Sequence, residues 1–190
     1  MSVDDEFKTV DAVVATKAET HGVDAFALSL IKSERQARKL LTHLVYQFPA
    51  FTRGDAAALR AALEANRRVY FDGVLSGFDA LYPKTIEMLV GVDFPRLRKR
   101  LNDAADQRNK IFHGQLTSLS LSRPDLLSFV TDIRNWCRHL AVGSLAEFDY
   151  DGFGRNSFRK SANPNLWRQF KVQLTSVADY EAFIKASMQR

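Results

Sequence analysis

The segment Arg108–Gly114 brings together residue types that could cleave RNA without a metal. It has the sequence Arg-Asn-Lys-Ile-Phe-His-Gly, so an asparagine follows the arginine and a glycine follows the histidine. A histidine titrates near neutral pH and can take or give the proton of an attacking or leaving oxygen. An arginine keeps its charge and grips phosphate oxygens with two N–H groups. We therefore predict His113 as the acid–base group, with Arg108 and Asn109 binding the phosphate and orienting the histidine.

The separation of Arg108 and His113 constrains how they could act together. Residues five apart are turned by roughly 140° on an ideal helix, so these two do not share a face. Three arrangements would resolve this: Arg108 lies where a helix begins or kinks, its long side chain wraps around, or a second subunit completes the site.

The same arginine–histidine spacing occurs twice more, as Arg38/His43 and Arg134/His139. The latter pair also has an asparagine directly after its arginine, so spacing and asparagine together do not select one site. Only Arg108–Gly114 has the following glycine as well. The other two pairs fall within predicted helices whose apolar faces already explain their spacing. We therefore favour the middle pair, with Arg134/His139 as the first alternative.

A purely structural interpretation of His113-Gly114 stands beside the catalytic one. A glycine after the last helical residue supplies the left-handed turn that ends many helices, and an imidazole there faces the negative end of the helix dipole.

Apolar residues that recur at three- and four-residue steps predict that helices make up most of the chain. The expected helices cover about 4–20, 24–48, 55–81, 86–90, 93–108, 124–143 and 177–186. Gly143 is expected to end the helix that begins near Pro124. The predicted fold is all-α, an antiparallel bundle of four or five helices over residues 1–147. Residues 148–190 form a smaller C-terminal extension, with turns and short strands at 148–150 and 170–174.

The arginine, the following asparagine and the histidine–glycine pair resemble the defining motif of the HEPN superfamily, and the resemblance extends over about residues 24–143. It implies metal-independent cleavage of single-stranded RNA to 2′,3′-cyclic phosphate ends by a homodimer that pairs two motifs across one cleft. It also implies a toxin or anti-phage defence role with an antitoxin or defence-system partner. The branch silenced by nucleotidylation has a tyrosine two places after the histidine, where this chain has Gln115. HEPN proteins sometimes place an acid such as Glu34 near the site, although a solvated glutamate with local ion pairs is the simpler interpretation.

The net charge of +5 and pI of about 9.4 are compatible with a polyanionic partner such as RNA. The candidates for contacting the RNA backbone are basic residues of one predicted helix: Arg96, Arg98, Lys99, Arg100 and Lys110. The alternative is that such clusters are ordinary solvated helix faces. The lone Cys137 excludes an internal disulfide framework and a cysteine-rich zinc site, and we expect no metal or cofactor.

No stretch is apolar over the roughly 20 residues that span a bilayer, and the N-terminus does not resemble a signal peptide. We therefore expect a cytoplasmic protein without a membrane partner. Two other functions remain open. The chain could be a non-catalytic helical module that binds RNA or protein, or a helical regulator with no nucleic-acid role.

Overall fold

The computed structural model describes residues 2–66, 69–114, 121–154, 158 and 164–189. The α-helices in these ranges are α1 Val3–Val14, α2 His21–Val45, α3 Ala56–Glu64, α4 Phe71–Leu81, α5 Ile86–Val90, α6 Phe94–Phe112, α7 Arg123–Phe148 and α8 Val177–Ser187. Short 3-10 segments are η1 Arg53–Asp55, η2 Gly91–Asp93 and η3 Leu166–Gln169. The described residues contain no strand, so the all-α prediction is confirmed.

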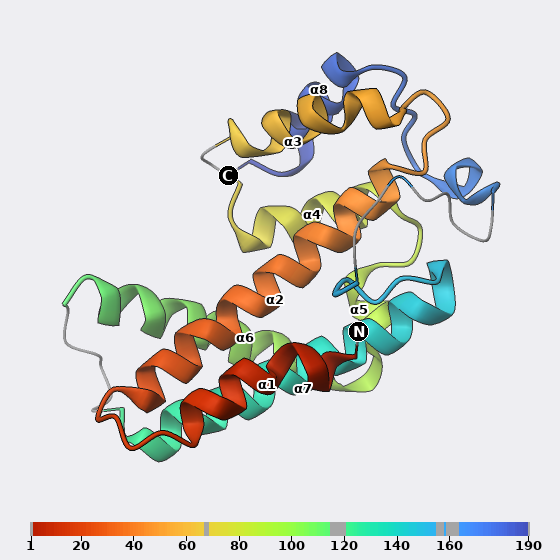
Figure 1. The fold of residues 1–190 in the computed structure, drawn as a ribbon. Coiled ribbons are helices and arrows are strands. Elements are labelled where there is room, and N and C mark those ends of the chain that lie inside the picture. Colours follow the sequence, from red (N-terminus) through yellow and green to blue (C-terminus); the bar gives the residue numbers. More distant parts are fainter. Residues whose placement is uncertain (1, 67–68, 115–120, 155–157, 159–163, 190) are drawn as a thin grey trace.

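The long helix α2 organises the bundle. It packs against α7 along much of its length and also contacts α1 and α4, while α6 lies beside α7 (Figure 1). Beyond the end of α2, α8 covers α3 and α4. The core is aliphatic and aromatic, as the three- and four-residue spacing of apolar residues predicted.

A buried amide fixes the centre of the α2–α7 contact. Gln36 of α2 is fully buried, and its Nε2 donates to the carbonyls of Cys137 in α7 and Asp151 beyond it, at 3.0 Å each. A buried amide without partners would be costly, so these bonds set the register of α2 on α7. Cys137 itself is fully buried, and burial raises the pKa of its thiol.

The predicted helix over 55–81 is in fact two helices. α3 ends at Glu64, and the Asn66 carbonyl accepts the N–H of Val69 at 3.1 Å. Tyr70 then has an extended backbone before α4 begins at Phe71. The break lets α3 pack on α8 while α4 packs on α2, which one straight helix could not do.

The predicted strands at 148–150 and 170–174 are wrong. Phe148 belongs to α7, and Phe170 and Leu174 are held by burial in the core rather than by pairing with a neighbouring strand. The Lys171 N–H donates to the Leu81 carbonyl at 3.0 Å, an isolated bond and not part of a ladder. The predicted final helix is confirmed as α8.

Within the described ranges, no helix combines the length and the apolar character needed to cross a bilayer.

Gly143 does not end α7, contrary to the prediction; the helix continues five residues further to Phe148. A Cβ placed at Gly143 would lie 2.2 Å from the Leu89 carbonyl oxygen of α5. The glycine therefore permits a close helix crossing and is not a terminator.

This crossing predicts that Gly143→Ala destabilises the protein. Alanine favours a helix over glycine by roughly 0.5–1 kcal/mol, but overpacking against Leu89 costs about 1–3 kcal/mol, so the free energy of unfolding should fall. Urea unfolding followed by circular dichroism measures it. Gly54→Ala is the matched control, because a Cβ there meets only the Thr52 hydroxyl oxygen at 3.4 Å. A Gly143→Ala variant more stable than the wild type would contradict the close approach.

Candidate functional site

An ion pair between α2 and α6 holds the motif arginine. The Nη1 of Arg108 lies 3.1 Å from the Glu34 carboxylate, and both side chains are a little over a quarter exposed. The Nε and Nη2 of Arg108 donate to the Oδ1 of Asn109 at 3.3 and 3.2 Å. The guanidinium is therefore held from two sides at the protein surface. Glu34 makes this pair across the bundle and not within its own helix, so the interpretation of Glu34 as making only local ion pairs is wrong.

His113 lies at the exposed end of α6. Its N–H donates to the Asn109 carbonyl at 3.0 Å, and the Gly114 N–H donates to the Ile111 carbonyl at 3.1 Å. Gly114 has a φ of +63°, the left-handed conformation of a helix-ending glycine. The His113 side chain is exposed, and its imidazole has no hydrogen-bond or ion-pair partner among the described residues.

The structure brings together Glu34, Arg108 and Asn109, and it leaves His113 five residues further along. Because α6 is continuous from Phe94 to Phe112, Arg108 does not mark the beginning of a helix. No hydrogen bond within the described part joins the Arg108 and His113 side chains. Of the three arrangements considered, a wrapped arginine or a second subunit therefore remains. Gln115 lies outside the described residues.

In the two other arginine–histidine pairs, Arg134 and both histidines contact neighbouring groups of the fold. His43 is buried, with its ring centroid 4.5 Å from that of Tyr150, and burial lowers its pKa to about 4. Arg134 lies over the Phe7 ring and pairs with Asp11. A ring nitrogen of His139 lies 3.2 Å from the Val90 carbonyl oxygen. These contacts explain why a histidine stands at each position without invoking catalysis.

Most basic residues of the predicted RNA-contacting cluster on α6 form ion pairs with aspartates. Arg96 and Arg100 both bind Asp132 of α7, at 2.7 and 2.8 Å, and Arg98 binds Asp72 of α4 at 2.7 Å. These pairs hold α6 to its neighbours.

Lys99 and Lys110 have no ion pair in the described part of the chain. They line a hollow of about 960 Å³ between α6 and α7. Four aspartates also line it and balance its four cations: Asp103, Asp106, Asp125 and Asp132.

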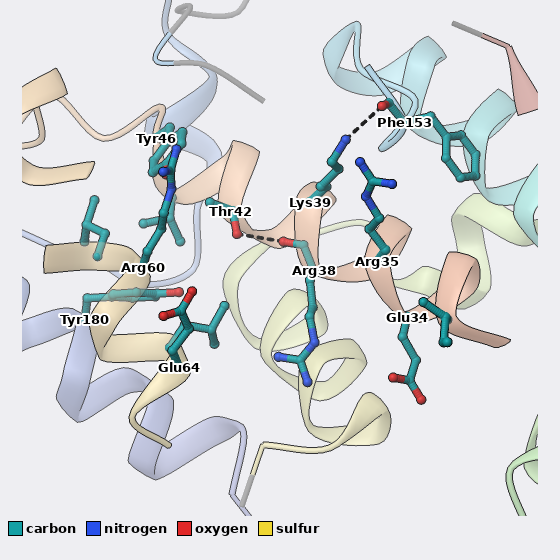
Figure 2. A pocket seen from close by; sticks show the side chains of 14 residues that line it. Glu34, Arg35, Arg38, Lys39, Thr42, Tyr46, Arg60, Glu64, Phe153 and Tyr180 are labelled. Carbon is teal, nitrogen blue, oxygen red and sulfur yellow. Dashed lines mark hydrogen bonds between the residues drawn. The ribbon is translucent and has the colours of Figure 1, made fainter. Parts of the chain in front are cut away.

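A second hollow, which the sequence reasoning missed, runs along the outer face of α2 towards α3 and α8. It has a volume of about 910 Å³, and four basic residues line it: Arg35, Arg38, Lys39 and Arg60 (Figure 2). Three of them are spaced so that they share one face of α2. That spacing was the feature of the sequence from which this hollow could have been predicted. Glu34 lines the same hollow.

No family model, curated protein or solved structure matches this chain in the three comparisons. No group of three or more histidine, cysteine or acidic side chains positioned for a metal ion occurs in the ranges that the structure describes.

The buried His43 predicts a loss of stability in acid. Its pKa is about 4 in the folded protein and about 6.5 when unfolded, so below pH 6.5 the unfolded state binds the extra proton. Burial of the neutral His43 therefore lowers the free energy of unfolding only below pH 6.5. The loss grows as the pH falls towards 4 and is on the order of 2–3 kcal/mol. His43→Phe keeps a ring against Tyr150 and should lose less stability between pH 7 and pH 4.5 than the wild type. Urea unfolding at both values measures this; equal losses in the two proteins would contradict it.

Proposed function

We propose that this protein is a metal-independent endoribonuclease of the HEPN type, which cleaves single-stranded RNA and leaves 2′,3′-cyclic phosphate ends. The observation that carries the proposal is the surface arrangement of Glu34 with Arg108 and Asn109, the latter two on the helix whose end carries the exposed side chain of His113. The 2′-hydroxyl would lose its proton to a histidine, its oxygen would bond to phosphorus, and the bond to the 5′-oxygen would break as that oxygen gains a proton. Arg108 would stabilise the charge on the non-bridging oxygens.

The contacts of Arg108 support this role. The ion pair with Glu34 uses Nη1 and orients the guanidinium. The Nε–Nη2 edge, which suits a two-pronged phosphate contact, faces only the neutral Asn109 oxygen. A phosphate could replace that oxygen, and rotation of the Asn109 amide would then turn its NH₂ group towards the same phosphate. Lys110, which has no acidic partner within the described residues, could steer the RNA backbone.

In a two-fold homodimer, Arg108 and His113 of one subunit would not need to share a helix face, because the motifs of the two subunits would face each other across one cleft. Ile31 and Phe112 support this part of the proposal, since their relative exposures are 54% and 65%. Helices α2 and α6 run in opposite directions (Figure 1), so Ile31 and Phe112 both lie to the same side of the Glu34–Arg108 pair, about one turn away. Exposed apolar side chains beside a half-site are suited to an interface.

Such an activity would suit a toxin or anti-phage effector, and its host would then need an antitoxin or defence-system partner. The second candidate function is a non-catalytic helical module that binds RNA or protein. It is favoured by one observation: His113 and Gly114 form a complete helix end that needs no catalytic explanation.

Replacing the imidazole tests the enzymatic proposal. His113→Ala should lower the rate of RNA cleavage in EDTA by at least about a hundredfold, because proton transfer loses its carrier. Its melting temperature should stay close to that of the wild type, because the side chain is exposed. Gel analysis of a mixed RNA substrate, with identification of the fragment ends, measures the activity.

His139→Ala is the matched control, since it removes a histidine with the same spacing from an arginine and should leave cleavage unchanged. RNA that remains intact with the wild-type protein, or that is cleaved equally by the His113→Ala variant, would rule out the proposed enzyme. RNA binding that persists without any cleavage would favour the non-catalytic module.

The dimer has its own test. Phe112→Glu should shift the protein towards the monomer in light scattering, because the dimer interface would have to bury a charge. The rate of RNA cleavage should fall as the dimer is lost. Val92→Glu is the control: Val92 is 95% exposed and precedes the opposite end of α6. A wild-type protein that is monomeric and fully active would refute the two-fold site.

A further inference from the structure

The hollow along α2, here called the basic pocket, has the size of a small-ligand site. Its volume of about 910 Å³ falls within the usual range for such sites, roughly 300–1,000 Å³. Figure 2 shows Arg35, Arg38 and Lys39 extending from α2 and Arg60 from α3, with Tyr180 of α8 at the side of Arg60 and Glu64. Three helices therefore contribute to one concave surface.

The basic pocket has an excess of positive charge. Four cations line it, and the acids that line it are Glu34, which is paired with Arg108, and Glu64. Arg35 is also paired with the buried carboxylate of Glu6 at 3.3 Å, a carboxylate that Lys32 shares. Arg38 donates to the Val69 carbonyl at 3.0 Å, a neutral group that positions the guanidinium without cancelling its charge. Arg60 is exposed and has no ion pair among the described residues.

Lys39 is also positioned by neutral groups. It donates to the carbonyls of Phe153 and Gly154 at 2.8 and 2.9 Å. Burial first, and then repulsion from Arg35, lower its pKa. The carboxylates of Glu6 and Asp151 oppose this shift.

Two tyrosines give the basic pocket buried polar groups. Tyr46 and Tyr180 are each 1% exposed. The Tyr46 hydroxyl is buried and has no hydrogen-bond partner in the described part of the chain. Burial and the neighbouring Tyr46 raise the pKa of Tyr180, whereas Arg38 lowers it, so the three groups are close enough to interact. A buried hydroxyl without a partner is unfavourable, and a ligand oxygen would satisfy it.

The remaining walls are apolar. Val45, Leu59 and Leu63 line the pocket beside the polar groups. An inorganic phosphate would leave these walls in contact with water, and a fatty acid would use only one of the several cationic groups. The combination suits a ligand that carries both phosphate oxygens and a flat ring.

We infer that the basic pocket binds a nucleoside phosphate, with the phosphate groups against Arg38 and Arg60 and the base against the apolar wall of Val45, Leu59 and Leu63. Such a ligand has two sources: a free nucleotide, or one nucleotide of an RNA strand. Glu34 lines the pocket and also pairs with Arg108, so a strand could extend from one site to the other. The inference does not depend on RNA cleavage.

Isothermal titration calorimetry at low salt tests the inference, with ADP, inorganic phosphate and a 2′-O-methyl hexaribonucleotide that cannot be cleaved. The full-length protein should bind ADP or the hexamer more tightly than phosphate. Arg60→Gln should weaken binding about tenfold, the usual effect of losing one hydrogen bond to a charged group. The matched control Arg53→Gln removes an exposed arginine outside the pocket and should bind like the wild type.

Tyr46→Phe separates binding from folding. It removes a hydroxyl that has no partner among the described residues, so the melting temperature should not fall, whereas the affinity for the nucleotide should. Weaker binding in either Arg60→Gln or Tyr46→Phe, with normal binding in Arg53→Gln, supports the pocket. If neither variant binds more weakly, the inference is overturned.

Binding of neither ADP nor the hexamer, or phosphate binding as tight as ADP binding, would also overturn it. Saturation by ADP identifies a free nucleotide as the source, and binding of the hexamer alone identifies an RNA strand. His113→Ala should bind ADP like the wild type, since His113 does not line the pocket. Loss of cleavage and loss of nucleotide binding are thus separate results.

Discussion

The burial of one face of α2 against α7 is the constraint on which the rest of the structure depends. Phe26, Leu30, Ala37 and Leu40 are at most 3% exposed on that face. A helix rotates about 100° per residue, so fixing these positions also fixes which residues point outward. Glu34, Arg35 and Arg38 are those outward residues at the middle of the helix. The same packing therefore supplies an acid for Arg108 and two cations for the basic pocket.

The basic residues of α6 and those of α2 have different kinds of partner. On α6, Arg96, Arg98 and Arg100 contact aspartates of α4 and α7, so the most basic stretch of the sequence mainly joins helices. On α2, Arg38 is held by a backbone carbonyl and keeps its full charge for a ligand. Counting basic residues along the chain pointed to α6, whereas the neutral partner of Arg38 points to α2. The difference arises because ion pairs depend on neighbours that are distant in sequence.

The spacing of apolar residues along the chain predicted much of the fold. The apolar spacing in α2, α6, α7 and α8 was sufficient, because each of these helices buries one continuous face. The passage of α7 through Gly143 was not predictable locally, because its cause is the backbone of Leu89 on another helix.

For the candidate site, the exposed helix end at His113-Gly114 followed from residue types alone. The pairing of Glu34 with Arg108 did not, since 74 positions separate them and only the packing of α2 near α6 brings them together. The basic pocket was missed for the same reason, because its walls come from three helices. The relationship to the HEPN superfamily stays a prediction that rests on the motif.

The burial of Cys137 has a practical consequence. Its thiol lies beneath α2, beside the carbonyl that Gln36 holds, and the raised pKa keeps it protonated. Alkylating reagents attack the thiolate, so they can reach this sulfur only when α2 separates from α7. The chain thus carries one intrinsic chemical reporter at its centre. The rate at which that sulfur is modified measures how often the bundle opens, without any label or knowledge of the ligand.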